Sequence, residues 1–315
     1  MVEEAREALR GMVKETPLQF NRGLSEKLGA QVYLKREDLQ VVRSYKLRGA
    51  FNRMRGLSRV EKKRGIVCVS AGNHAQGVAF CCKALKVKGA MVMPQNTPRQ
   101  KVERVKSLGN AWITVELVGD SFDEAYEFAS ALARKKNMAF IHPFDDALVI
   151  AGQGTVGVEI LEQADRKVDY VIVPVGGGGL ISGVGSYFKS KSPKTKIIGA
   201  EPAGAAAMYE SLKAGKLVEL KKIDTFVDGA AKRKVCDLTL RLTKKVADRV
   251  LRVLEGEVCQ EMISLYQRDG IVAEPAGALS VAVLNQLGKP LLKGKTIVCI
   301  ISGGNNDISR YPEVI

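Results

Sequence analysis

The stretch Val171-Ile-Val-Pro-Val-Gly-Gly-Gly-Gly-Leu180 decides the fold, because an uncharged β-branched run leads directly into four glycines. The residues that follow, 180–188, have the apolar spacing of a helix. Short β-branched runs followed by a turn with Gly or Ser and then an amphipathic segment recur along the chain. On this pattern we expect strands at residues 65–69, 90–93, 112–117, 171–175, 197–200 and 296–301. Helices are expected at residues 75–85, 99–108, 121–135 and 180–188.

Apolar strands that alternate with helices are typical of parallel sheets that helices cover on both faces. We therefore predict an α/β protein with two parallel-sheet domains. Residues 32–37 alternate instead between apolar and polar side chains, which favours an edge strand or an extended segment. No linker divides the chain into halves, so we expect an inserted second domain. Residues 51–144 would form a small α/β domain, and residues 1–50 plus 145–315 a large one.

Composition limits the class of protein. The 315 residues are 46% hydrophobic and 26% charged, which is typical of an ordinary globular chain. The net charge is +15, and residues 189–252 carry 16 basic against 7 acidic side chains. With only 6% aromatics and no recognition motif, a solvated lysine-rich surface is favoured over a nucleic-acid partner. Residues 170–188 lack charge, but their six glycines favour a strand and a loop over a membrane span.

The cysteines and histidines do not suggest a metal or disulfide framework. The six cysteines include no CxxC pair, and His74 and His142 are too far apart for a zinc-finger pattern. Reduced thiols in a cytoplasmic protein are therefore expected. The charged opening MVEEAREALR is not typical of a signal peptide.

Three glycine-containing turns follow predicted strands, at residues 70–77, 176–179 and 302–304. Because ligands of such sheets bind outside the carboxyl ends of the strands, we expect the three turns to converge on one crevice. The four consecutive glycines can direct backbone N–H groups at an anion, next to the positive end of the following helix. The sequence therefore predicts that residues 176–179 bind a phosphate, and we call this loop the phosphate cup. It lacks the Lys-Ser/Thr of a P-loop, so nucleoside triphosphate hydrolysis is not implied.

Two further features are ambiguous on their own. Gly152-Gln-Gly-Thr-Val-Gly157 matches GxGxxG after residues 147–151, which could pass for a strand, and so leaves dinucleotide binding as an alternative. The acidic residue that this alternative requires is not evident, because Asp169 begins a predicted strand instead of ending one. Lys46 enters a predicted helix from an extended segment. It is either a surface lysine or, if a cleft desolvates it, a nucleophile or proton carrier.

Four motifs together carry a resemblance that none of them carries alone. They are Ser44-Tyr-Lys-Leu-Arg-Gly-Ala50, Ser70-Ala-Gly-Asn-His-Ala-Gln-Gly77, Pro174-Val-Gly-Gly-Gly-Gly-Leu180 and Ser302-Gly-Gly304. In this order and spacing the chain resembles the fold-type II pyridoxal-phosphate enzymes, whose fold is like that of tryptophan synthase β, and among them the threonine dehydratases. The resemblance covers essentially the whole chain. It extends to Thr16-Pro-Leu18, Lys35-Arg-Glu-Asp38, Phe226-Val-Asp-Gly-Ala230 and Gly270-Ile-Val-Ala-Glu-Pro-Ala-Gly277.

The resemblance implies a role for each motif. Lys46 would hold pyridoxal 5'-phosphate (PLP) covalently and, once substrate releases it, remove the α-proton. Asn73 would contact the ring hydroxyl, and Ser302 would face the pyridine nitrogen, where a hydroxyl makes the ring a poorer electron sink than an aspartate would. The cofactor phosphate would bind Gly176, Gly177, Gly178, Gly179 and Leu180. The substrate carboxylate would bind the turn formed by Ser70, Ala71, Gly72, Asn73 and His74.

Three positions depart from the family pattern. Tyr45 stands where the family usually has Phe, a mild change. Related serine racemases carry a second acid–base serine where Ala71 stands, so this chain is expected to eliminate and not to racemise. The racemases' divalent-cation site aligns with Glu201 and following residues, but Ala207 replaces an aspartate ligand. No divalent metal is therefore expected, and a monovalent cation such as K+ near Glu201 is left as an option.

The implied reaction converts L-threonine into 2-oxobutanoate and ammonia, with L-serine to pyruvate as a side activity, as a first step towards isoleucine. A serine/threonine racemase or a threonine synthase on the same scaffold is the alternative. The family's habit implies a homodimer or homotetramer. The sequence stops a few residues after the Ser302 motif, which leaves no room for the regulatory domain of the longer biosynthetic forms. It is either a naturally short form or the catalytic core of a longer protein, and we expect no feedback inhibition of this chain by isoleucine.

Overall fold

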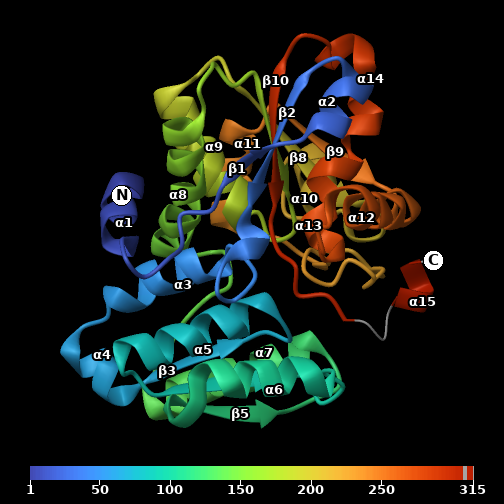
Figure 1. The fold of residues 1–315 in the computed structure, drawn as a ribbon. Coiled ribbons are helices and arrows are strands. Elements are labelled where there is room, and N and C mark those ends of the chain that lie inside the picture. Colours follow the sequence, from blue (N-terminus) through green and yellow to red (C-terminus); the bar gives the residue numbers. More distant parts are fainter. Residues whose placement is uncertain (308–310, 315) are drawn as a thin grey trace. The chain divides into compact units, whose positions relative to one another are not determined.

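The computed structural model describes residues 1–307 and 311–314, which group into two compact units (Figure 1). The smaller unit contains Met1, Glu3–Val13 and Lys46–Gly152. The larger unit contains Val2, Lys14–Tyr45 and the chain from Gln153 onward. The domain limits expected from the sequence, 51–144 against the remainder, stay a prediction.

The smaller unit has a four-stranded parallel sheet in the order β5-β4-β3-β6. Its strands are β3 (Ile66–Val69), β4 (Gly89–Met93), β5 (Ile113–Leu117) and β6 (Ala139–Phe140). Its helical segments are α1 (Val2–Leu9), α3 (Lys46–Arg55), α4 (Arg59–Arg64), α5 (Asn73–Leu85), α6 (Arg99–Gly109), η2 (Asn110–Trp112) and α7 (Phe122–Lys136). Val67 and Val69 pack with Ala125 of α7 on one face. Cys68, between them in β3, points to the opposite face, where it and its cross-strand neighbour Met91 are fully buried, so both faces are covered.

The larger unit has a six-stranded sheet in the order β1-β2-β10-β7-β8-β9. All neighbouring strands are parallel except β1 and β2, which are antiparallel. The strands are β1 (Leu18–Phe20), β2 (Gln31–Arg36), β7 (Tyr170–Pro174), β8 (Lys196–Pro202), β9 (Arg249–Val253) and β10 (Thr296–Ile301). The helical segments are α2 (Arg22–Leu28), η1 (Glu37–Leu39), α9 (Gly179–Lys191), η3 (Ala203–Ala205), α10 (Ala207–Ala214), α11 (Asp237–Val246), α12 (Glu255–Asp269), α13 (Pro275–Ala282), α14 (Leu284–Leu292) and α15 (Tyr311–Val314).

Successive residues of the central strands face opposite layers of helices. Ile172 packs in the cluster formed with α12 and α13, whereas Val171 and Val173 pack in the cluster formed with α9 and α11. Strand β7 is therefore apolar along its length, because both faces of the sheet are buried there. The predicted α/β class with two parallel-sheet regions is confirmed.

Two sequence-based expectations differ from the structure. Residues 32–36 are extended in β2, as one of the two options had it, but β2 is not at the edge, because β1 pairs outside it, and Glu37 begins η1. The residues 147–151 are not a strand: α8 (Ala147–Gln163) runs through them and through the whole GxGxxG match. Periodicity could not tell the two apart, since this segment is apolar on all sides. The match therefore lies inside a helix and does not form a dinucleotide-binding turn.

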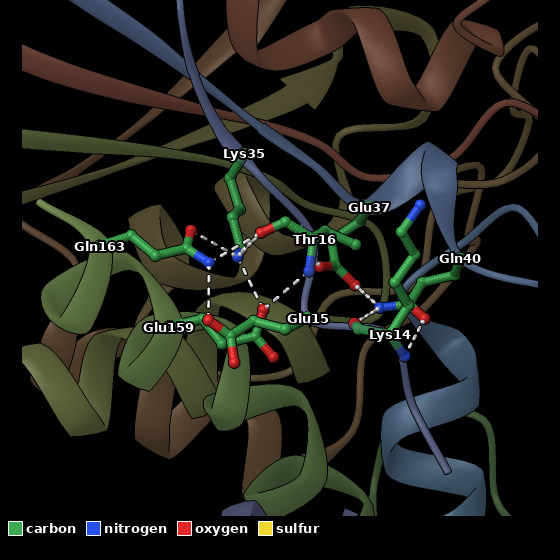
Figure 2. Close-up of polar contacts among 8 residues, drawn as sticks. All are labelled: Lys14, Glu15, Thr16, Lys35, Glu37, Gln40, Glu159 and Gln163. Carbon is green, nitrogen blue, oxygen red and sulfur yellow. Dashed lines mark hydrogen bonds and ion pairs between the residues drawn. The ribbon is translucent and has the colours of Figure 1, made fainter. Parts of the chain in front are cut away.

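A buried polar network holds the N-terminal segment of the larger unit (Figure 2). Lys35 is fully buried, and its Nζ donates to the Thr16 carbonyl at 2.6 Å, to Glu159 Oε2 at 2.7 Å and to Gln163 Oε1 at 3.1 Å. Thr16 Oγ1 in turn donates to Glu37 Oε1 at 2.5 Å. These bonds tie the chain before β1 to β2, to η1 and to α8.

The structure also bears on two expectations from the sequence, that the chain has no membrane span and that its cysteines are reduced. Within residues 1–307 and 311–314, no helix combines the length and the apolarity needed to cross a membrane. The six cysteines are free thiols. Burial raises the pKa of Cys82 to about 12 and that of Cys68 well above its ordinary value, so these thiols are unreactive at neutral pH.

Candidate functional site

Two of the three predicted turns lie side by side in the larger unit. The four-glycine loop follows β7, and the Ser302 turn follows β10. Since β7 and β10 are adjacent and parallel, their carboxyl ends lie at the same edge of the sheet. The third turn, residues 70–77, follows β3 in the smaller unit. Its convergence with the other two stays a prediction.

The glycine loop has the geometry of an anion cup. Gly178 is the N-cap of the 13-residue helix α9 and has a positive φ of 86°, which side-chain-bearing residues rarely adopt. A Cβ on Gly176 would lie 2.7 Å from the Ala230 carbonyl oxygen. Leu180 is 2% exposed and packs in the core below, so only its backbone can serve a ligand. The N–H groups at the start of α9, together with the helix dipole, favour a phosphate.

Ser302 is hydrogen-bonded to α13 and to Tyr45 in the segment before α3. It is 3% exposed, and its Oγ donates to the Ala276 carbonyl at 3.2 Å. Its own carbonyl accepts from the Tyr45 N–H at 3.1 Å, and Ser44 bridges to Gly303. The Ser302 hydroxyl keeps its lone pairs as acceptors in this arrangement. It can reach another partner as a donor by rotation about its C–O bond.

Lys46 is the first residue of α3 in the smaller unit and is half-buried. Its Nζ donates to the Pro143 carbonyl at 2.8 Å. A Cβ on Gly77 of α5 would lie 3.2 Å from the Leu47 nitrogen and 3.3 Å from the Lys46 carbonyl carbon. The glycine therefore permits the close approach of α5 to the start of α3, and this brings the amine-bearing residue to the helix that the 70–74 turn begins.

The 70–74 turn is held by its own side chains. Ser70 Oγ accepts from the Gly72 N–H at 3.1 Å, and Asn73 is the first residue of α5. His74 is 2% exposed, with Nε2 2.8 Å from the Ile141 carbonyl oxygen. This contact gives His74 a scaffolding part.

The second histidine organises the lysine's partner. His142 Nδ1 accepts from the Asp145 N–H at 2.7 Å and from the Phe144 N–H at 3.3 Å. The Phe144 ring also stacks edge-on against His142, with ring centroids 4.7 Å apart. His142 therefore fixes the turn that presents the Pro143 carbonyl to Lys46.

Glu274 belongs to this region, although sequence reasoning gave it no role. It is 4% exposed and precedes α13, and its Oε1 fills the position that a Gly303 side chain would occupy. Burial and then the charge of Glu274 raise the pKa of the Tyr45 phenol well above its ordinary value. The motif around Glu274 was recognised, but its proximity to the Ser302 turn depends on α13 lying beneath β10.

Both carboxylate oxygens of Glu201 bind backbone N–H groups. Its Oε1 accepts from the Met208 N–H and its Oε2 from the Tyr209 N–H, both at 2.8 Å. Burial raises the pKa of Glu201 to about 8, although these two bonds act in the opposite direction. Among the described residues, no group of three or more His, Cys, Asp or Glu side chains could hold a metal ion. A monovalent cation at Glu201 stays a prediction.

The fold and these residues together define a class. In the larger unit, the phosphate cup at the edge of a parallel sheet fits the phosphate of a cofactor. In the smaller unit, the half-buried lysine amine at a helix start fits an aldehyde. The profile described as "Pyridoxal-phosphate dependent enzyme" matches residues 9–303. The chain belongs to this family of PLP-dependent enzymes, and its fold is the fold type II expected from the motifs.

Named relatives narrow the comparison. The chain is 52% identical over 310 residues to the biosynthetic L-threonine dehydratase IlvA of Halalkalibacterium halodurans, covering 98% of this chain and 74% of the relative. It is similar to the processed form of threonine deaminase isoform 2 from Solanum lycopersicum, with TM-score 0.92 and 39% identity over 99% of this chain and 91% of that one. Maize serine racemase gives TM-score 0.92 and 31% identity over 99% and 94%.

Gly176→Ala tests the cup. The new methyl would overlap the backbone of Ala230, which cannot give way as a flexible side chain could. We expect PLP to bind about tenfold more weakly, from an overpacking cost of about 1–3 kcal/mol. Gly256→Ala in α12 is the matched control, because a Cβ there meets nothing within 4 Å. Fluorescence titration with PLP measures both, and equal affinities for the two variants would remove Gly176 from the cup.

Proposed function

We propose that this chain converts L-threonine into 2-oxobutanoate and ammonia with bound PLP, and L-serine into pyruvate more slowly. The observation that carries the proposal is the 52% identity, over 98% of the chain, to a protein named L-threonine dehydratase. The chain also contains the residues that the resemblance assigns to the cofactor: Lys46, the four glycines and Ser302. The same activity would place the chain in isoleucine biosynthesis.

Each residue has a definite task in this proposal. When bound, PLP withdraws electrons from the α-carbon of the amino acid. The Lys46 amine holds the cofactor before substrate arrives and then accepts the α-proton at Nζ. The N–H groups of the loop from Gly176 to Gly179 bind the phosphate, and those of the turn from Ser70 to His74 orient the substrate carboxylate.

The choice between elimination and racemisation depends on two groups that the proposed site lacks: a charged partner for the pyridine nitrogen and a second proton donor. Ser302 offers a neutral hydroxyl where an aspartate would stabilise a long-lived carbanion, so loss of the β-hydroxyl is favoured. Ala71 supplies no proton to the second face of the substrate. Both features favour elimination over racemisation. Threonine and serine differ by one methyl group, a contact of only about 1–3 kcal/mol, so both should react.

The test is product analysis of the PLP-loaded protein. With L-threonine we expect 2-oxobutanoate and ammonia in equal amounts, and no D-allo-threonine, the product of inversion at the α-carbon, by chiral chromatography. D-allo-threonine without oxo acid would favour the racemase alternative. Turnover of O-phosphohomoserine to threonine would favour a threonine synthase. A protein that takes up PLP and transforms none of these substrates would contradict the proposal.

Location and assembly belong to the same proposal. We infer a cytoplasmic enzyme that forms a homodimer or homotetramer, as the family habit and the free thiols favour. Light scattering of the eluting protein gives the mass directly. A mass of 34.2 kDa, that of one chain, would contradict the inferred assembly.

A further inference from the structure

Glu201 lies at the end of β8, the strand next to β7, which carries the glycine loop. Its side chain is fully buried. Both of its carboxylate oxygens accept N–H groups from the first turn of α10. The N-cap residue of that helix is Ala206, which has no polar side chain to satisfy these donors. A residue of the sheet therefore caps α10.

Helix α10 contacts the glycine loop through its second residue. A Cβ on Gly178 would lie 2.5 Å from the Met208 Cε and 3.2 Å from the Thr239 Cβ. The Met208 methyl therefore occupies the space directly beneath Gly178, at the point where the loop takes its positive φ. The N–H of this same residue binds Glu201 Oε1.

We propose that Glu201 is a positioning residue for the phosphate cup: its carboxylate fixes the first turn of α10, and that turn holds the Met208 methyl against Gly178. The inference rests on the proposed role of the glycine loop in binding PLP. It adds that a residue of β8, the strand next to β7, supports this loop. Each oxygen of Glu201 accepts one N–H group, and two directional hydrogen bonds define where Met208 lies. Neither residue touches the phosphate itself in this scheme.

The outer side of α10 provides a matched control. Glu210 lies on the same helix, and its Oε1 is 3.8 Å from Arg252 Nη1, an ion pair in which both side chains are at least one-third exposed. The guanidinium of Arg252 also lies over the Tyr209 ring, 4.6 Å from its centroid. Glu210→Gln makes the same replacement of a carboxyl group by an amide as Glu201→Gln without touching the contact between Met208 and Gly178.

The experiment measures PLP affinity and the phosphate environment, not turnover. We expect Glu201→Gln to weaken PLP binding about tenfold, since the amide accepts only one of the two N–H groups. Met208→Ala should weaken binding by a similar factor, whereas Met208→Leu and Glu210→Gln should stay within about twofold of the unsubstituted protein. The ³¹P resonance of bound PLP should shift in Glu201→Gln and Met208→Ala and stay in place in the two controls.

The double variant Glu201→Gln/Met208→Ala separates positioning from independent effects. If Glu201 acts through Met208, the PLP affinity of the double variant is no lower than that of whichever single variant binds PLP more weakly. Multiplied losses, or unchanged affinity in Glu201→Gln, overturn the inference. Replacing K+, Na+ and Mg2+ by tetramethylammonium must leave the affinity of the unsubstituted protein unchanged. A fall to the Glu201→Gln level would mean that Glu201 acts through a cation. Failure of the unsubstituted protein to bind PLP would instead reject the proposed function.

Discussion

Replacing Lys46 with alanine is expected to lower threonine turnover by about 10³-fold or more, because the proposed reaction uses this amine both to hold PLP and to accept the α-proton. The fold should survive, since Lys46 is only half-buried, at the first position of α3. Release of 2-oxobutanoate measures the effect, and the thermal midpoint checks the fold.

Lys62→Ala is the matched control for this prediction. Lys62 is half-buried on α4 of the same unit, and its Nζ also donates to a backbone carbonyl, that of Arg55. Its removal should leave the rate unchanged. Reduction with borohydride before digestion should fix PLP on the peptide that contains Lys46, and no such peptide should form in Lys46→Ala. Turnover in that variant at the rate of the unsubstituted protein would reject the mechanism.

The second large effect concerns stability. Lys35→Met should lower the free energy of unfolding by about 3–5 kcal/mol, because it leaves the Glu159 carboxylate buried without its cation. The Thr16 carbonyl loses its Nζ donor as well, so the segment before β1 loosens. Denaturant unfolding monitored by circular dichroism measures the loss.

The double variant Lys35→Met/Glu159→Leu shows whether a charge without a partner is the cause. Removing both charges from a buried pair is often neutral, so the double variant should recover most of the lost stability. Breaking the exposed pair Arg22 and Glu26 by Arg22→Met should cost at most about 0.5 kcal/mol. A double variant as unstable as Lys35→Met would show that packing, and not charge, dominates at this position.

The sequence predicted the strands that are apolar throughout, because burial on both faces leaves an uninterrupted β-branched run. It did not predict β1 or β9. Leu18–Phe20 has only three residues and none of them is buried, and Arg249–Val253 carries two arginines. Helix α8 was misread in its first turn for the opposite reason, since a segment that is apolar all round has no period to recognise.

Only part of the candidate site could likewise be predicted from the sequence. Lys46 and the glycines were found because their local motifs are distinctive. Glu274 and Met208 were not found, since their significance depends on which elements are neighbours in space. The contact of Glu274 with Gly303 requires α13 to lie against β10, and that of Met208 with Gly178 requires β8 to lie beside β7. Spacing along the chain contains neither fact.

The position of β10 has a consequence for biosynthesis on the ribosome. Among residues 1–307 and 311–314 no strand follows β10, yet β10 lies inside the sheet of the larger unit, between β2 and β7. The antiparallel pair of β1 and β2, which is synthesised early, therefore has no parallel partner until residues 296–301 have emerged. Residues 46–152 contain all four strands of the smaller sheet, which can pair much earlier. Nascent chains that stop before β10 should expose two unpaired strand edges, and these are the chains that chaperones would have to shield.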